Sequence, residues 1–125
     1  MTQRRENNIM NEIPQNKVTW FQLPADNVDR AYGFYNDVFN WDKNDALINE
    51  RNLGAINGTI ESRTLTFQYP RLVIRVENFS RTLEQIKKAG GKIIVDRTEI
   101  PEIHMVYATF EDTEGNVLNI VADLK

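Results

Sequence analysis

The chain has no cysteine and one histidine among its 125 residues. The lack of cysteine excludes disulfides, thiolate metal sites and a cysteine nucleophile. No Ser–His pair has the spacing of a catalytic triad, and His104 has no imidazole co-ligand in the chain. The sequence therefore assigns no catalytic residue.

The chain also lacks long apolar runs and an excess of positive charge. No apolar run is long enough to span a bilayer, and the N-terminus lacks the apolar core of a secretion signal, so we expect a cytoplasmic protein that does not bind membranes. The formal net charge is −3. Nucleic acid is not an expected partner, because sequence-independent binding requires a basic face.

Length and composition predict one globular domain. The chain is 41% hydrophobic and 26% charged, close to soluble averages, and 125 residues are too few for two independent cores. Residues 1–17 are polar without periodicity and predict a flexible arm, within which Met10 is an alternative start to Met1. Residues 18–125 form the expected domain.

A tight hairpin near the C-terminus organises the chain. Gly115 and Asn116 tolerate positive φ between two apolar segments, which predicts strands 105–110 and 117–122 joined by a short turn. The turn sets the register of the second strand, so alternate residues share a face. One face carries Val117, Asn119 and Val121, and the other carries Leu118 and Ile120.

The first half of the chain predicts a strand, a helix and further strands. Residues 18–23 alternate as a strand that Pro24 ends, and Asp26 or Asn27 then caps a helix over 28–39 with apolar residues at three- and four-residue spacing. Residues 46–51 and 53–60 are expected to be short strands. A further strand around Leu65 and Phe67 is an open alternative.

The second half repeats this order of elements. Residues 71–76 form a strand, Asn78 caps a helix over 79–89, and Gly90 and Gly91 end it. Strand 93–95 and the hairpin follow. A shift of 51 residues places Asn27 on Asn78 and Arg30 on Arg81, which suggests a duplicated unit.

Four motifs give the chain its resemblance to a known superfamily. They are LPADNVDRA at 23–31, FYxxVFxW at 34–41, AGGK at 89–92 and DTEGN at 112–116. With these motifs the chain resembles the vicinal oxygen chelate superfamily, which includes glyoxalase I, bleomycin-resistance proteins and extradiol dioxygenases. The likeness runs from about residue 18 to 122.

The resemblance implies an α+β fold of two βαβββ modules, about 18–67 and 70–123, whose sheets form a cup with the helices outside. It also implies a homodimer. Seven apolar residues are expected to pack beneath the helices. They are Phe21, Leu23, Leu72, Ile74, Val76, Leu118 and Ile120.

The family's metal site has no equivalent donors here. Metal-dependent relatives use ligands on the first strand of each module and a Glu three residues after the Gly-Asn turn, which correspond to Trp20, Arg71 and Asn119. An indole has no lone pair for a metal, a guanidinium is a permanent cation and a carboxamide replaces a carboxylate poorly. We therefore expect no bound metal and no other cofactor.

The opposite strand faces are expected to line the cup. Candidate ligand-binding residues are Trp20, Gln22, Arg71, Arg75, His104, Tyr107 and Asn119. An aromatic platform with a cationic or amide end would suit an anionic or polar small molecule. In the structural alternative, Arg75 pairs with a nearby acid such as Glu77 or Glu99, Trp20 fills space and His104 is an exposed loop residue.

Three functions remain open. The first is a metal-free small-molecule binding protein of the bleomycin-resistance type. The second is a metal-dependent lyase or isomerase resembling glyoxalase I, or a dioxygenase-like enzyme, with Gln22, His104 or a Glu of the first module as an unusual ligand. The third is a partner-binding accessory domain with a vestigial cup.

Overall fold

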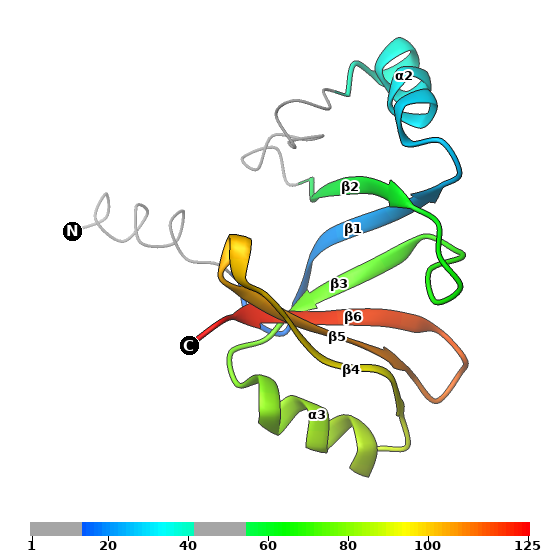
Figure 1. Cartoon of the computed structure of the whole chain (residues 1–125). Coiled ribbons are helices and arrows are strands. Elements are labelled where there is room, and N and C mark those ends of the chain that lie inside the picture. Colours follow the sequence, from blue (N-terminus) through cyan, green and yellow to red (C-terminus); the bar gives the residue numbers. More distant parts are fainter. Residues whose placement is uncertain (1–13, 42–54) are drawn as a thin grey trace, which may run out of the picture.

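The computed structural model describes residues 14–41 and 55–125. Within these two ranges it has one six-stranded mixed sheet, in the order β2-β1-β3-β6-β5-β4, and the two α-helices α2 and α3 (Figure 1). The elements are β1 (Lys17–Ala25), α2 (Val28–Phe39), β2 (Asn57–Ser62), β3 (Arg71–Arg75), α3 (Phe79–Lys88), β4 (Lys92–Ile100), the 3₁₀ turn η2 (Pro101–Ile103), β5 (Met105–Glu111) and β6 (Val117–Asp123). Two expected segments, the arm up to residue 13 and the strand 46–51, lie outside the described residues.

Strand pairing confirms the predicted α+β architecture. The second module is a complete βαβββ unit, β3-α3-β4-β5-β6, in which β3 runs parallel to β6. In the first module β1 runs parallel to β2 in the same way. The two first strands, β1 and β3, pair antiparallel and join the modules into one sheet.

The predicted duplication appears in the helix caps. Asn27 Oδ1 accepts a hydrogen bond from the Arg30 N–H at 2.9 Å, and Asn78 Oδ1 accepts one from the Arg81 N–H at 3.1 Å. Each bond satisfies one of the free N–H groups of a first helical turn. Asn27, rather than Asp26, is therefore the cap of α2.

The core lies between α3 and the sheet. Its buried residues are Val76, Phe79, Leu83, Val106, Ala108, Ile120 and Ala122. Ile120 therefore lies on the helix side of β6, as its alternation predicts. Leu72 does not follow the prediction, because 46% of it is exposed; it lines a pocket near the start of β3.

The helix α2 packs differently from α3. None of its residues is buried, and in Figure 1 it stands beyond β2, at the opposite end of the molecule from α3. The Ile60 N–H of β2 donates to the Tyr32 hydroxyl at 3.1 Å. Tyr35 stacks on Trp41, with ring centroids 4.5 Å apart.

The close approach of β2 to β1 depends on Gly58. This residue pairs with Phe21, and a Cβ placed on it would lie 2.5 Å from the Phe21 carbonyl oxygen and 2.6 Å from the ring. Any larger side chain would push the strands apart. Gly58 thus sets the position of the strand that carries Thr59 and Glu61.

The β5–β6 turn has the predicted chemistry. Gly115 has φ +86°, and Asp112 Oδ1 accepts the N–H groups of Glu114 and Asn116 at 2.8 and 2.9 Å. The side-chain amide of Asn116 donates to the other carboxylate oxygen at 3.0 Å. These bonds, led by that of the Asn116 side chain, lower the pKa of Asp112.

Three strands have bounds that differ from the predicted ones. The strand predicted at 18–23, with Pro24 as its end, is β1, which continues through Pro24 to Ala25 because both residues pair with β2. The strand predicted at 93–95 runs from Lys92 to Ile100, because residues 96–99 continue to pair with β5 despite two register shifts. The strand predicted at 53–60 is β2, over Asn57–Ser62. Among the described residues, no helix is long and apolar enough to cross a membrane.

Candidate functional site

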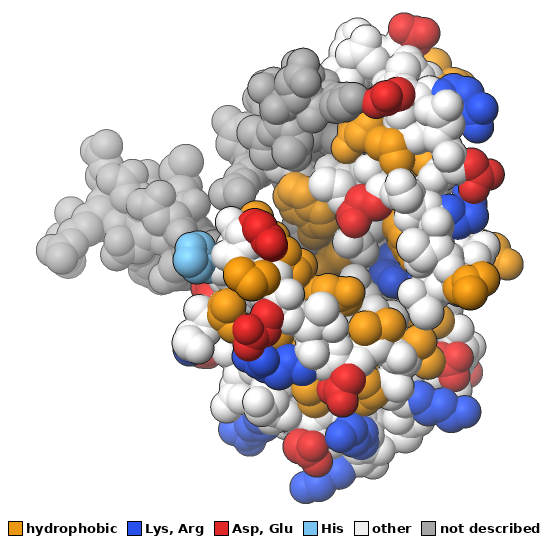
Figure 2. Space-filling view, in the orientation of Figure 1, with side chains coloured by type: hydrophobic (Ala, Val, Ile, Leu, Met, Phe, Trp, Pro, Cys, Tyr) orange, Lys and Arg blue, Asp and Glu red, His pale blue; other side chains and the backbone are white. Residues whose placement is uncertain are grey.

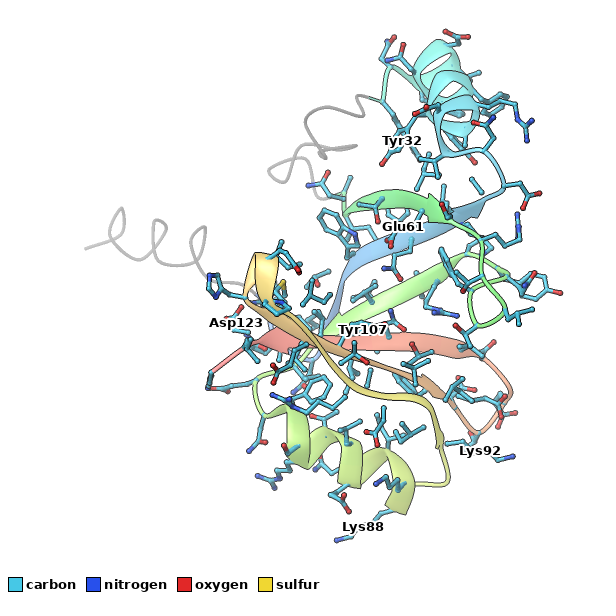
Figure 3. The ribbon with its side chains drawn as sticks, in the orientation of Figure 1. Tyr32, Glu61, Lys88, Lys92, Tyr107 and Asp123 are labelled. Atoms are coloured by element: carbon cyan, nitrogen blue, oxygen red, sulfur yellow. The ribbon has the colours of Figure 1, made fainter. Side chains whose placement is uncertain are left out.

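The sheet face opposite the α3 core borders a hollow. In Figure 2 the surface is indented between the upper and lower halves of the molecule. Figure 3 shows Glu61 of β2 and Tyr107 of β5 on the two sides of this space. Strand register places Asn57, Trp20, Val73, Asn119 and Thr109 in one row across this face.

A chain of side-chain hydrogen bonds crosses the boundary between the modules. The Thr109 hydroxyl donates to Asn119 Oδ1 at 2.6 Å, and Asn119 Nδ2 donates to Gln22 Oε1 at 3.3 Å. Gln22 Nε2 in turn donates to Glu61 Oε2 at 2.9 Å. Thr109 and Asn119 are 1% and 6% exposed, so the chain runs from the buried sheet centre to a carboxylate at the surface.

A second chain reaches the same carboxylate oxygen. The Trp20 indole N–H donates to Thr59 Oγ1 at 3.4 Å, and the Thr59 hydroxyl donates to Glu61 Oε2 at 2.6 Å. Every donor in the two chains is oriented toward Glu61, and a carboxylate is acceptor-only when ionised. Glu61 is therefore the endpoint of both chains.

Arg71 lies in the same face but is buried. It is 8% exposed, its guanidinium stands 5.0 Å from the centroid of the Phe67 ring, and Nη2 donates to the Thr66 carbonyl. Its Nε is buried without a hydrogen-bond partner. Burial lowers the pKa of Arg71, and the charges of Glu61 and Tyr107 act in the opposite direction. Arg71 is therefore a buried cation on the face that also carries Glu61 and Tyr107.

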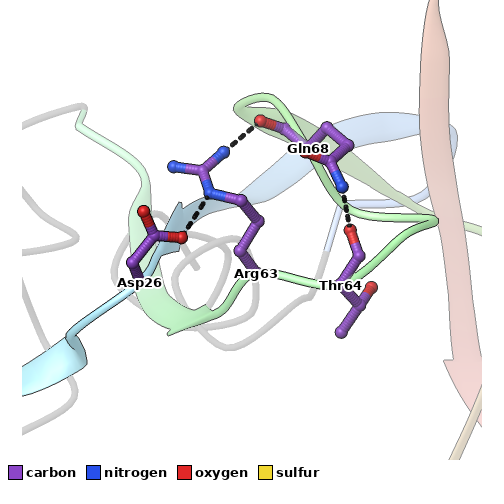
Figure 4. A network of polar contacts seen from close by, with 4 residues as sticks. All are labelled: Asp26, Arg63, Thr64 and Gln68. Atoms are coloured by element: carbon purple, nitrogen blue, oxygen red, sulfur yellow. Dashed lines mark hydrogen bonds and ion pairs between the residues drawn. The ribbon is translucent and has the colours of Figure 1, made fainter.

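The loop between β2 and β3 holds Arg71 in place. Arg63 Nε donates to Asp26 Oδ1 at 2.9 Å and its Nη1 donates to the Gln68 carbonyl, while Gln68 Nε2 donates to the Thr64 carbonyl at 2.7 Å (Figure 4). This network anchors the segment that supplies Thr66 and Phe67. A pocket of about 820 Å³ lies between this loop and the 112–116 turn, and Arg71 lines it too.

The structure brings five of the seven predicted ligand-binding residues onto this face near Glu61. They are Trp20, Gln22, Arg71, Tyr107 and Asn119. Arg75 forms an ion pair with Asp123 at 2.5 Å, whereas Glu77 or Glu99 was the expected partner; Glu99 instead pairs with Arg97. Asp123 reaches Arg75 because β3 and β6 are adjacent.

His104 lies apart from these residues. It caps the 3₁₀ turn η2 with φ 53°, in the connection between β4 and β5. Its N–H donates to the Pro101 carbonyl at 3.1 Å, and its carbonyl accepts from the Leu124 N–H at 2.8 Å. His104 is therefore an exposed loop residue, as expected if it has a structural rather than a ligand-binding position.

Sequence reasoning missed Thr59 and did not single out Glu61 among the first-module carboxylates. Alternation along β5 placed Thr109 on the cup face, but it did not show that Thr109 is connected to the other two residues. The alternation of Asn57, Thr59 and Glu61 would have revealed a polar face, had the strand been extended beyond residue 60. Their pairing with Gln22 and Asn119 depends on which strands are neighbours, which the local pattern does not specify.

The residues at the positions of the family's metal ligands do not suit a divalent cation. The Trp20 indole donates its proton to Thr59, the Arg71 guanidinium is a cation, and Asn119 Oδ1 already accepts from Thr109. Thr59 occupies the position in β2 of the first module that Asn119 occupies in β6 of the second, and its side chain is a neutral hydroxyl. Among the described residues, no three His, Cys, Asp or Glu side chains form a group that could hold a metal.

Comparisons with known proteins agree with the fold. A scan against models of protein families gives no match. A glyoxylase-like domain-containing protein from Didymella fabae is 27% identical in an alignment of length 122, and the match covers 80% of this chain and 88% of the relative.

Two solved structures show the same fold. A Streptomyces coelicolor methylmalonyl-CoA epimerase in complex with 2-nitronate-propionyl-CoA aligns with a TM-score of 0.64 and 8% identity, over 90% of this chain and 100% of the epimerase. A glyoxalase/bleomycin resistance protein/dioxygenase superfamily member from Vibrio splendidus aligns with a TM-score of 0.58 and 10% identity, over 83% and 96%. The predicted resemblance is confirmed: the chain has the vicinal oxygen chelate fold.

Proposed function

We propose that this chain is a small-molecule binding protein whose ligand occupies the hollow of the sheet without a metal. The observation that carries the proposal is the hydrogen-bonded chain Thr109–Asn119–Gln22–Glu61, because it joins the two modules and ends at the surface of the hollow. Buried polar side chains are costly unless they are satisfied. We call the side chains of Thr109, Asn119 and Gln22 the polar floor of the hollow. Polar groups in the centre of a sheet are not needed for stability, which supports a role in binding a ligand.

The indole of Trp20 and the phenol of Tyr107 supply apolar contact area beside this polar floor. Ligand sites in proteins combine such aromatic surfaces with a few fixed polar groups. The epimerase of the same fold is solved with a CoA ester derivative, which supports a small molecule as the class of ligand for this fold.

Ligand-induced thermal stabilisation tests the proposal. A metabolite library is screened with and without a chelator, and a ligand at 100 times its dissociation constant is expected to stabilise the protein by about 2.7 kcal/mol. The ligand-induced shift in melting temperature should persist with the chelator and should be smaller in Gln22→Ala. Lys87→Ala, at an exposed position, is the control and should leave the shift unchanged. No shift from any compound would contradict a small-molecule function.

The metal-dependent lyase or isomerase is tested separately. Elemental analysis of protein purified without chelators should give substoichiometric nickel, zinc, manganese and iron, because the positions of the family's metal ligands hold an indole, a guanidinium and a carboxamide. A stoichiometric metal would replace the binding proposal with the enzymatic one.

We further propose a cytoplasmic homodimer that does not bind nucleic acid. Three large apolar side chains of α2 support a partner at this helix: Phe34, Val38 and Phe39 are 57%, 55% and 58% exposed. Light scattering should give twice the chain mass, and Phe39→Asp should shift it toward the monomer. A monomeric wild type would exclude the dimer.

A further inference from the structure

The accessible charge of the hollow is opposite in sign to the expected one. Sequence reasoning placed a cationic or amide end there, with Arg71 and Arg75 as the candidate cations. Both arginines are buried, at 8% and 9% exposure; one is held by Phe67 and Thr66, and the other by Asp123. Glu61, by contrast, is an exposed residue in a strand that faces the hollow.

The hydrogen bonds to Glu61 orient its carboxylate to accept a further hydrogen bond from a ligand. Gln22 and Thr59 both donate to Oε2, at 2.9 and 2.6 Å. Among the described residues, no hydrogen bond is formed with Oε1. Two charge-assisted bonds fix the carboxylate group, so Oε1 is held in one orientation for a further donor.

The remaining polar groups of the site do not compete for this role. Asn119 Oδ1 and Gln22 Oε1 already accept bonds from Thr109 and Asn119. Arg71 is the cation of this face on which the charge of Glu61 acts, but its guanidinium is buried against Phe67 and donates to the Thr66 carbonyl. The charged residues Asp123, which pairs with Arg75, and Glu111, at the turn end of β5, lie farther along the face. Lys17 lies opposite Arg75 at the start of β1.

From these contacts we infer that Glu61 is the recognition point of the hollow, and that it binds the ammonium or another strongly hydrogen-bond-donating group of an organic ligand. Trp20 is linked to Glu61 by two hydrogen bonds through Thr59, and Tyr107 lies across the hollow. Their rings provide the apolar and π surface that the body of such a ligand requires. The inference rests on the proposed binding function and specifies its ligand class.

Matched probes test the charge preference. Benzylamine, benzyl alcohol and benzoate share one ring and differ in the group that meets the protein, and a cyclohexyl set repeats the comparison without the aromatic ring. Each is titrated into ¹⁵N-labelled protein while the indole N–H of Trp20 and the side-chain amides of Gln22 and Asn119 are followed. We expect the amines to bind at least tenfold more tightly than the acids.

Two variants assign the preference to one carboxylate. Glu61→Gln keeps an oxygen that accepts from Gln22 and Thr59, and it should weaken amine binding at least tenfold. Glu99→Gln is the matched control, because Glu99 is an exposed carboxylate that pairs with Val106 in register and so lies on the opposite face. Circular dichroism should show both variants folded.

The outcomes separate this inference from the proposed function. If the acids bind the hollow more tightly than the amines, the binding function stands and the role of Glu61 is overturned. Amine binding that Glu61→Gln leaves unchanged also overturns it. If no probe of either set moves the Trp20, Gln22 and Asn119 signals, both the inference and the proposed function are overturned.

Discussion

The two modules begin with the same order of elements but contribute differently to the core. Their helices begin at equivalent asparagine caps, and each first strand runs parallel to its module's last strand. In the second module α3 buries Phe79 and Leu83, whereas α2 buries no residue. The second module therefore supplies the core, whereas both modules contribute to the hollow, the first with Trp20, Gln22 and Glu61 and the second with Tyr107, Thr109 and Asn119.

The difference is visible at equivalent helix positions. With the 51-residue offset, the exposed Phe34, Val38 and Phe39 of α2 correspond to Gln85, Ala89 and Gly90 at the end of α3. A duplicated unit can thus keep its backbone plan while one copy exposes large apolar side chains that the other lacks. This division makes four predictions, given in order of decreasing effect.

The largest effect is expected in the core. Leu83→Ala removes a side chain that is 8% exposed and should lower the free energy of unfolding by about 2–5 kcal/mol. Phe34→Ala, at 57% exposure, should cost less than about 1 kcal/mol in a monomeric sample at low concentration. Urea denaturation measures both, and equal costs would contradict the division between the modules.

The polar floor gives the next effect. Thr109→Val keeps the side-chain shape but leaves the buried Asn119 Oδ1 without its 2.6 Å donor, so it should cost about 1–3 kcal/mol. Thr98→Val is the control, because the Thr98 hydroxyl donates to the Asp96 carbonyl in an exposed setting. Its cost should be clearly smaller. Equal melting temperatures for the wild type and Thr109→Val would show that the floor is not fixed by this bond.

The helix caps compare the modules directly. Asn78→Ala should lower global stability by about 1 kcal/mol, because α3 belongs to the core. Asn27→Ala removes an equivalent bond, but it should mainly increase amide hydrogen exchange in α2, since a helix with few buried contacts opens locally. Exchange measured by mass spectrometry distinguishes the two. A larger loss of global stability for Asn27→Ala than for Asn78→Ala would contradict the view that α3, and not α2, belongs to the core.

The smallest effect concerns the β5–β6 turn. The hydrogen bonds from Asn116 and Glu114 lower the folded pKa of Asp112 from its ordinary value of 3.8. The stabilisation they give is therefore present above the unfolded pKa and is lost as the pH falls through the folded value. The stability difference between wild type and Asp112→Ala should be constant above about pH 5 and shrink below pH 4. A difference that grows on acidification would be incompatible with this sign.

The sequence predicted those parts of the fold that local patterns determine. The α2 boundaries, the Asn78 cap and the β5–β6 hairpin follow from caps, spacing and turn residues, and the structure confirms them. The length of β4 was missed because Asp96, Arg97 and Glu99 give it a polar composition, although strand pairing with β5 outweighs that composition.

The site was predictable only in part. Alternation along β1, β5 and β6 placed Trp20, Tyr107 and Asn119 on one face, but it gave no information on what their polar atoms contact. The burial of Arg71 depends on Phe67 and Thr66 in a loop, and the partner of Arg75 comes from the distant residue Asp123. Such contacts follow from the three-dimensional arrangement of the chain rather than from local sequence.

A crystal structure of protein purified from cells without chelator or added ligand tests the central claim most directly. The account predicts density for an organic molecule in the hollow, with a donor atom within hydrogen-bonding distance of Glu61 Oε1. A metal ion coordinated by the oxygens of Glu61, Gln22 and Asn119 would contradict it.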